Sequence, residues 1–235
     1  MEAGRRIYAI GDIHGRVDLL NQLLERIGED LASRPIATSV LVFLGDYIDR
    51  GLASRETIDR LIACAKTHQA IFLKGNHELI ALKCLSDAGL FGSWMRRLGG
   101  TETLLSYGID PKDFSGEDRI ARLQAAFHKA LPQTHLRFFR NLETSFTCGD
   151  FFFAHAGVRP GVALSDQKET DLLWIRDEFL ASNVDFGKIV IHGHTPVLEV
   201  EVAPNRINID TGAFATGRLT CLVIEQSSLS KIDTA

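Results

Sequence analysis

The sequence contains little cysteine and no long apolar segment, and both features narrow what the protein can be. Four isolated cysteines occur in 235 residues, without a Cys-x-x-Cys spacing: Cys64, Cys84, Cys148 and Cys221. Cysteines in this pattern are typical of buried, reduced thiols. No apolar run approaches the ~20 residues that span a bilayer, and the first residues lack the apolar region of a signal peptide. We therefore expect a cytoplasmic protein without membrane contact.

The chain also has no excess of positive charge. Its 26 basic and 30 acidic residues give a formal net charge of -4, and both signs are spread along the chain. Nucleic-acid binding through phosphate contacts typically uses a basic stripe, so we expect no nucleic-acid partner. The content of 45% hydrophobic and 24% charged residues is typical of a globular protein. We predict one α/β domain over residues 1–235.

Short apolar runs alternate with helical patterns in the first third of the chain. The runs at 7–10, 39–44 and 70–73 predict buried strands, and apolar residues at helical spacing separate them. Ser54 is the expected N-cap of the second of these helices. Three strand–helix units in succession predict a right-handed, mainly parallel sheet.

The middle of the chain lacks such strand-like runs. Helical patterns and scattered glycines occupy residues 78–142, which predicts a helical excursion within the domain, with residues 85–142 as the insertion. Strand-like runs then return at 143–147, 151–154, 188–191, 197–203, 206–209 and 219–225. We expect a hairpin turn at Gly149, and we expect the polar last ten residues to be frayed.

Polar residues follow five of the predicted strands, usually beside glycine. They are Asp12, His14, Asp46, Asp49, Arg50, Asn76, His77, His155, His192 and His194. One such motif alone more often marks a surface loop, but chance would rarely repeat it at five strand ends. Charged groups are costly to bury unless they are paired or bind a metal, and ligands bind beyond the carboxyl ends of strands in open α/β sheets. The pattern predicts a shared metal site.

The types of the candidate ligands narrow the metal. Carboxylates, imidazoles and one amide, with no thiolate, argue against a structural zinc site. Six ligands exceed what one ion normally uses, whereas two ions that share a bridging carboxylate are found in phosphatases and nucleases. Mixed nitrogen and oxygen ligation favours manganese, iron, zinc or cobalt over magnesium. We expect two divalent metal ions, and manganese is the metal that we favour.

Three motifs make the chain similar to the phosphoprotein-phosphatase branch of the calcineurin-like metallophosphoesterases. They are Gly11-Asp12-x-His14-Gly15, Gly45-Asp46-x-x-Asp49-Arg50-Gly51 and Gly75-Asn76-His77-Glu78. Three later motifs resemble the bacterial and bacteriophage-lambda type Ser/Thr protein phosphatases more closely: Trp174-Ile175-Arg176, Gly193-His194-Thr195-Pro196 and Ile209-Asp210-Thr211-Gly212-Ala213. The resemblance covers nearly the whole chain. It implies an α/β fold in which two mixed β-sheets are sandwiched between helices, a four-layer αββα arrangement.

The resemblance also implies a ligand set. It assigns six metal ligands: Asp12 and His14 to the first ion, Asp46 to both ions, and Asn76, His155 and His194 to the second. In the wider superfamily a Gly-His-x-His motif supplies two ligands. Here Pro196 stands two residues after His194, so only one ligand is expected from this motif. We expect His192 to pack or to support a ligand.

The catalytic roles complete what the resemblance implies. Two cations would lower the pKa of a shared water for direct in-line attack on phosphorus, without a phosphoenzyme. Arg50 and Arg176 would stabilise charge on the phosphoryl oxygens. His77 would be the general acid that protonates the departing alkoxide, and Asp49 would hold its ring in position.

We therefore predict a phosphomonoester hydrolase, a monomeric Ser/Thr-type phosphatase that acts on phosphoproteins or phosphopeptides, with small phosphoesters as further substrates. The alternative is a nucleotide hydrolase that resembles symmetric diadenosine tetraphosphatases. In that branch the residue at the Asp49 position is often not acidic and the third motif tends to end in aspartate, so Asp49 and Glu78 favour the protein phosphatase. A non-catalytic scaffold would have lost a ligand or the Asp49–His77 pair, and neither is missing. Substrate specificity is expected in residues 85–142 and 157–169.

Overall fold

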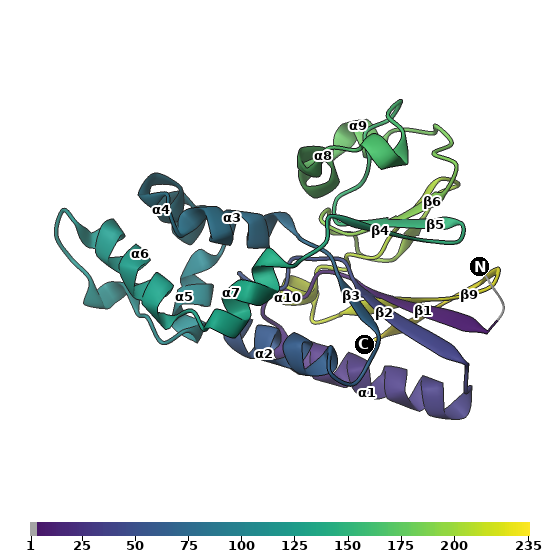
Figure 1. Cartoon of the computed structure of the whole chain (residues 1–235), viewed down its shortest axis with the longest axis horizontal. Helices are drawn as coiled ribbons and strands as arrows, with labels where there is room; N and C mark the ends of the chain where they lie inside the picture. The colour runs from purple at the N-terminus through teal and green to yellow at the C-terminus, as the bar shows by residue number, and fades with distance from the viewer. Residues whose placement is uncertain (1–3) are drawn as a thin grey trace.

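The computed structural model describes residues 4–235, and its first β-sheet has five strands in the order β10-β9-β1-β2-β3 (Figure 1). The strands are β1 (Arg5–Ile10), β2 (Thr38–Phe43), β3 (Ala70–Phe72), β9 (Thr220–Glu225) and β10 (Ser228–Asp233). β1, β2 and β3 run parallel, as predicted, whereas β9 is antiparallel to β1 and to β10. The sheet is therefore mixed.

The second sheet also has five strands, in the order β4-β5-β6-β8-β7. They are β4 (Ser145–Cys148), β5 (Phe151–Ala154), β6 (Ile189–His192), β7 (Glu201–Val202) and β8 (Arg206–Asn208). The three central strands β5, β6 and β8 are parallel, and the edge strands β4 and β7 are antiparallel to their neighbours. The predicted hairpin joins β4 to β5, with Gly149 in the turn at a φ of 56°.

Helices cover the outer face of each sheet, which confirms the predicted four layers (Figure 1). Helices α1 (Val17–Ser33) and α2 (Ser54–Cys64) cover the first sheet, and α8 (Glu169–Trp174) and α9 (Asp177–Leu180) cover the second. The alternation of side chains along β1 explains the layering. Ile7 and Ala9 belong to the core between the sheets, whereas Tyr8 and Ile10 pack under the helices.

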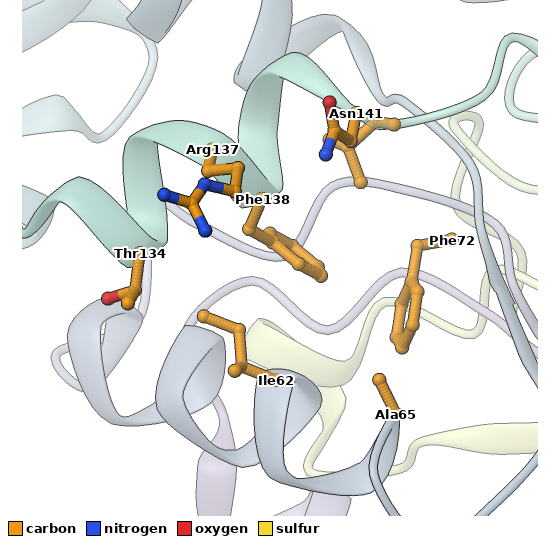
Figure 2. A pocket seen from close by; sticks show the side chains of 8 residues that line it. Ile62, Ala65, Phe72, Thr134, Arg137, Phe138 and Asn141 are labelled. Carbon is orange, nitrogen blue, oxygen red and sulfur yellow. The ribbon is translucent and has the colours of Figure 1, made fainter.

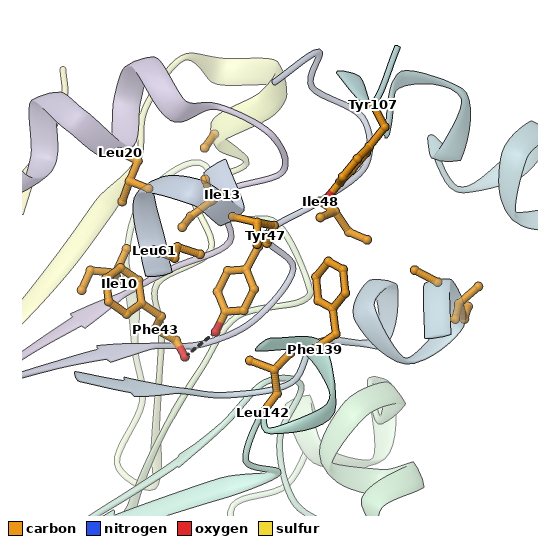
Figure 3. Packing of buried hydrophobic residues seen from close by; sticks show 14 of the residues in the cluster. Ile10, Ile13, Leu20, Phe43, Tyr47, Ile48, Leu61, Tyr107, Phe139 and Leu142 are labelled. Atoms are coloured by element: carbon orange, nitrogen blue, oxygen red, sulfur yellow. Dashed lines mark hydrogen bonds between the residues drawn. The ribbon is translucent and has the colours of Figure 1, made fainter. Parts of the chain in front are cut away.

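The helical segment between β3 and β4 extends past the ends of both sheets (Figure 1). It contains α3 (Asn76–Cys84), α4 (Ala88–Arg97), α5 (Gly100–Ser106), a 3₁₀ turn (Pro111–Asp113), α6 (Arg119–Ala130) and α7 (Gln133–Arg140). Its apolar side chains share one core cluster with α1, α2 and the first sheet. Figure 3 shows Phe139 and Leu142 from this segment packed around Tyr47. The predicted helical excursion is confirmed.

Three local predictions were wrong. Residues 226–235 are not frayed, because β10 pairs along its length with β9; its side chains are polar because it is an edge strand. The run at 197–203 forms only the two-residue strand β7, since only Glu201 and Val202 pair with β8. Helix α2 begins at Ser54 and its N-cap residue is Ala53, because the Ser54 hydroxyl instead accepts the backbone N–H of Asp49, at 3.0 Å.

The four cysteines are buried and unpaired, as predicted. Within residues 4–235, no helix combines the length and the apolarity that a membrane crossing would require. An apolar hollow of about 290 Å³ lies between α2 and α7 (Figure 2). Its lining includes Ile62, Phe72 and Phe138 and none of the polar residues at the strand ends. This hollow is therefore separate from the site described next.

Candidate active site

The loops that follow β1, β2, β3, β5 and β6 bring their polar side chains together at one end of the two sheets. The six predicted metal ligands are each at most 6% exposed: Asp12, His14, Asp46, Asn76, His155 and His194. These residues follow five separate strands, and parallel strands deliver the residues after them to the same edge of a sheet. The cluster is therefore a product of the topology and not of one local motif.

Asp46 lies at the centre of this cluster. Its Oδ2 is 3.5 Å from Nε2 of His14 and 3.7 Å from Nε2 of His77, and its Oδ1 is 3.4 Å from Nε2 of His155. Burial alone would raise the pKa of Asp46, but the surrounding histidines hold that pKa well below its usual value. Asp46 is thus a carboxylate with histidines on both of its oxygens, the position expected of a bridging ligand.

A second group of ligand atoms gathers around His155. Its Nε2 lies 3.0 Å from Oδ1 of Asn76 and 3.1 Å from Nδ1 of His194. The carboxylate of Asp12 accepts the backbone N–H of His194, at 3.2 and 3.3 Å to its two oxygens. Nε2 of His194 is buried without a hydrogen-bond partner. Several acceptor atoms thus converge here, and one imidazole nitrogen is unsatisfied.

This donor set fits divalent cations. Burial, followed by the negative charges of Asp210 and Asp46, raises the pKa of Asp12 well above its usual value. Burial lowers the pKa of His14 to about 3 and that of His194 to about 2, so both imidazoles are neutral and able to bind a cation. Buried carboxylates that lie close to one another are stabilised by protonation or by positive charge between them, and a bound cation would supply that charge.

The ligand atoms form two compact groups of three that share Asp46. Within each group the atoms lie within 4.8 Å of one another: His14, Asp46 and His77 in one group, and Asp46, His155 and His194 in the other. His77, which is expected as the general acid, thus lies in one group with His14 and Asp46. Asp12 belongs to neither group, and its carboxylate accepts the backbone N–H of His194.

The predicted catalytic pair lies next to the cluster. Nδ1 of His77 is 2.7 Å from Oδ2 of Asp49, and both side chains are buried. Burial opposes a charge on His77, but Asp46 and the hydrogen bond to Asp49 raise its pKa to about 9. Nη2 of Arg50 lies 3.5 Å from Nε2 of His77. An acid and a guanidinium therefore stand together at the edge of the cluster.

The helical segment contributes two residues that the sequence pattern did not reveal. Trp94 of α4 donates its indole N–H to Oδ2 of Asp49 at 2.8 Å, and Thr103 of α5 donates its hydroxyl to Oδ1 at 2.6 Å. Trp94 and Thr103 are almost completely buried. Neither residue stands beside a glycine-rich strand end in the predicted pattern, so only the packing of α4 and α5 identifies them.

Glu78, the last residue of the third motif, holds the loop that carries Asp46. Its carboxylate accepts the backbone N–H groups of Asp46 (3.0 Å), Tyr47 (2.7 Å) and Gly75 (2.9 Å). The side chain is fully buried. Glu78 is one of the two residues that favour the protein phosphatase in the sequence motifs, but its carboxylate binds the protein backbone. Its effect on substrate choice would be indirect.

The backbone of the site is unusual. Six non-glycine residues within 4–235 have positive φ, and five of them belong to the site: His14, Asp46, Asp49, Arg50 and His194. Such conformations cost about 1–2 kcal/mol per residue, and they gather where the surrounding structure holds them in place. The strained residues thus lie in the same loops as the candidate ligands and the catalytic pair.

Arg176 and His192 lie at the margin of the site. Arg176 is exposed on the loop before α9 and donates to Oγ1 of Thr195 at 3.2 Å. His192 is buried with its ring edge-on to Phe179, at 5.0 Å between centroids. It belongs to neither group of ligand atoms. The structure thus brings Arg176 beside Thr195, the residue after His194. His192 packs against Phe179, outside the two groups of ligand atoms.

Comparison with known proteins assigns the chain to a family. A family model described as calcineurin-like phosphoesterase matches residues 5–217. The chain therefore belongs to the calcineurin-like phosphoesterase family, a family of hydrolases, and its His/Asp cluster is able to bind metal ions.

The relatives within this family carry two kinds of name. The serine/threonine-protein phosphatase 2 of Salmonella typhimurium is 30% identical over 94% of this chain and 94% of its own. The bis(5'-nucleosyl)-tetraphosphatase PrpE of Anoxybacillus flavithermus, named as asymmetrical, is 26% identical over 91% of this chain and 88% of its own. The crystal structure of a putative diadenosine tetraphosphatase superposes with a TM-score of 0.66, at 18% identity, over 99% of this chain and 98% of the other. The family is thus established, and the substrate class is left open.

Proposed function

We propose that the protein is a Ser/Thr-type phosphoprotein phosphatase that depends on metal ions. The observation that carries this proposal is the buried hydrogen bond of 2.7 Å between His77 and Asp49. A serine alkoxide is a strongly basic leaving group that needs a proton as the P–O bond breaks, whereas a departing nucleoside polyphosphate is a far weaker base. A general acid held in this way therefore favours an alkyl phosphate substrate.

We further propose that the site holds two divalent ions, with manganese first and iron, zinc or cobalt as alternatives. The ligands would be six buried side chains: Asp12 and His14 for one ion, Asp46 for both, and Asn76, His155 and His194 for the other. When bound, the ions supply a water of lowered pKa as nucleophile and positive charge for the phosphoryl oxygens. Direct attack by water leaves no phosphoenzyme.

The chain's own residues would bind the phosphoryl group and move the proton. Arg50 and Arg176 would hold phosphoryl oxygens through charge-assisted hydrogen bonds. A leaving oxygen near Arg50 also lies near Nε2 of His77, since the two side chains are 3.5 Å apart. Asp49 occupies Nδ1 of His77, which leaves Nε2 to carry the proton to the leaving group.

The second candidate is a nucleotide hydrolase, and exposed aromatic side chains beside the ligand cluster support it. Trp174 is 41% exposed and its ring lies 6.2 Å from that of His194, whereas Phe214 is 37% exposed and lies 5.5 Å from His14. Base–aromatic stacking contributes about 1–3 kcal/mol per base. A dinucleoside polyphosphate could use both rings, and relatives named tetraphosphatases support this reading.

One comparison of substrates tests the proposal. The protein is stripped of metal, reconstituted with Mn²⁺ and assayed on a phosphoserine peptide, on p-nitrophenyl phosphate and on diadenosine tetraphosphate. We expect phosphopeptide turnover that disappears in the stripped protein and returns with Mn²⁺. Rapid tetraphosphate cleavage with negligible phosphopeptide turnover would refute the phosphoprotein assignment and support the second candidate.

We also infer that residues 85–142 belong to the same domain as the sheets. The shared core cluster and the bonds from Trp94 and Thr103 to Asp49 support this view. We propose that the protein acts as a monomer in the cytoplasm, which its four unpaired, buried thiols support.

A further inference from the structure

A short stretch of the helical segment bonds to both Asp49 and the backbone of Arg50. Within residues 4–235, the other hydrogen bonds of Asp49 go to its own loop, to Ser54 and to His77. The Thr103 hydroxyl contacts Asp49 twice: it donates to Oδ1 at 2.6 Å and accepts the backbone N–H at 3.0 Å. Trp94 donates its indole N–H to Oδ2 at 2.8 Å, the same oxygen that faces Nδ1 of His77. The backbone N–H of Arg50 donates to the carbonyl of Gly99 at 3.2 Å.

Two glycines at the junction between α4 and α5 allow this close approach, because neither has a side chain. A Cβ on Gly99, whose φ is +86°, would lie 2.5 Å from the backbone nitrogen of Arg50. A Cβ on Gly100 would lie 2.5 Å from the indole of Trp94. Glycine at both positions therefore lets Trp94 and the α4–α5 turn reach the loop after β2.

These contacts constrain the general acid through its partner. Asp49 and Arg50 both have positive φ, at 71° and 67°, a conformation that persists only where neighbouring groups hold it. Each carboxylate oxygen of Asp49 receives a donor from the helical segment, so the carboxylate cannot rotate freely. Only one direction then remains for its hydrogen bond with His77.

We propose that Trp94 and Thr103 are positioning residues for proton transfer by His77, acting through Asp49. The inference rests on the proposed function, in which His77 protonates the leaving group. Without either bond, Asp49 would hold the His77 ring less firmly and the proton would reach the leaving oxygen less often. Metal binding would not change, because neither residue contacts a predicted ligand.

The test uses leaving groups of different basicity. Thr103→Val removes the hydroxyl with little change in shape, and Trp94→Phe removes the indole N–H. We expect each variant to lower kcat on a phosphoserine peptide about tenfold, a part of the ~10²–10⁴ that a general acid contributes. Turnover of p-nitrophenyl phosphate, whose leaving group needs no proton, should fall less than about threefold. KM and bound metal should be unchanged.

Two controls separate positioning from packing. Thr103→Ser restores the hydroxyl and should recover most of the lost phosphopeptide turnover. Phe91→Leu loosens the aromatic packing on Trp94, whose ring lies 5.4 Å from that of Phe91, and leaves the indole bond in place. Any loss in this variant should affect the two substrates alike.

The outcomes distinguish this inference from the function on which it rests. Equal losses on both substrates in Thr103→Val and Trp94→Phe, or no recovery in Thr103→Ser, would overturn the positioning role. His77→Asn provides the reference and should show the strongest dependence on the leaving group. If His77→Asn shows this dependence and the other two variants do not, only the present inference fails. If His77→Asn lacks it, the proposed general acid fails and the positioning role with it.

Discussion

The loops at the strand ends and the α4–α5 part of the helical segment both place buried polar groups in one site, yet they are encoded differently. The loops carry aspartate, asparagine and histidine next to glycine, directly after apolar runs. Trp94 and Thr103 instead lie inside helices α4 and α5, away from any strand end. The difference teaches that candidate ligands stand out in the local sequence, whereas residues such as Trp94 and Thr103, which bond to Asp49, are identified only by how distant elements pack.

The largest effect should come from the central ligand of the loops. Asp46→Asn removes the charge from the carboxylate that faces His14, His77 and His155. We expect bound divalent metal to fall below one ion per chain and phosphoester turnover to fall by at least about 10³-fold. Elemental analysis and the p-nitrophenyl phosphate assay would check both.

A matched control for this change is Asp18→Asn, which alters a 60% exposed carboxylate. It should leave metal content and turnover unchanged. Full metal binding by Asp46→Asn would contradict the central place of Asp46. The loops would then contribute less to the site, relative to the α4–α5 part of the helical segment, than we propose.

The next effect concerns the support that Glu78, in the first turn of α3, gives to the loop of Asp46. Glu78→Gln replaces a buried carboxylate that accepts N–H groups from Asp46, Tyr47 and Gly75 with an amide whose NH₂ cannot accept them. We expect a loss of about 2–3 kcal/mol in the free energy of unfolding, together with weaker metal binding. Urea unfolding and metal titration measure the two effects. An unchanged unfolding midpoint would show that the loop holds its shape without this carboxylate.

Support from the helical segment is tested at Gly99. Gly99→Ala combines a strained positive φ with a clash against the Arg50 backbone, and we expect a loss of about 2 kcal/mol in stability. Gly108→Ala is the matched control, because its φ of +80° is similar but nothing lies within 4 Å of the added Cβ. It should cost about 1 kcal/mol. Equal costs would mean that the contact with Arg50 is easily accommodated.

The smallest effect is expected from an ion pair outside both regions. The pair joins Arg159 to Asp171. Arg159 donates two hydrogen bonds to the carboxylate of Asp171, at 2.7 and 3.0 Å, and these lower the pKa of Asp171 below its unfolded value of about 3.9. The stabilisation is therefore present above pH ~4 and is lost as the pH falls through the folded pKa. Asp171→Asn should cost at most about 1 kcal/mol at pH 7 and nothing at lower pH. Thermal unfolding between pH 7 and pH 2.5 measures this difference, and a cost independent of pH would exclude the ion pair as its cause.

Much of the fold follows from sequence periodicity. The parallel order of the first three strands, the helices between them, the helical excursion and the β4–β5 hairpin were all predicted and are present. The errors occur where pairing partners and not composition decide the structure. The polar run that forms β10 was expected to fray, and the apolar run around Val200 was expected to be a full strand. Polar side chains are tolerated in β10 because it is an edge strand. The run around Val200 is short as a strand because only Glu201 and Val202 pair with β8.

The sequence by itself determined the family and the identity of the candidate ligands, because both reside in short motifs that need no knowledge of distant contacts. Only the tertiary structure decided that Glu78 binds the Asp46 loop, that His77 shares a group with His14, and that Trp94 and Thr103 reach Asp49. These contacts join residues far apart in the chain. Their geometry exists only after the helices have packed against the end of the first sheet.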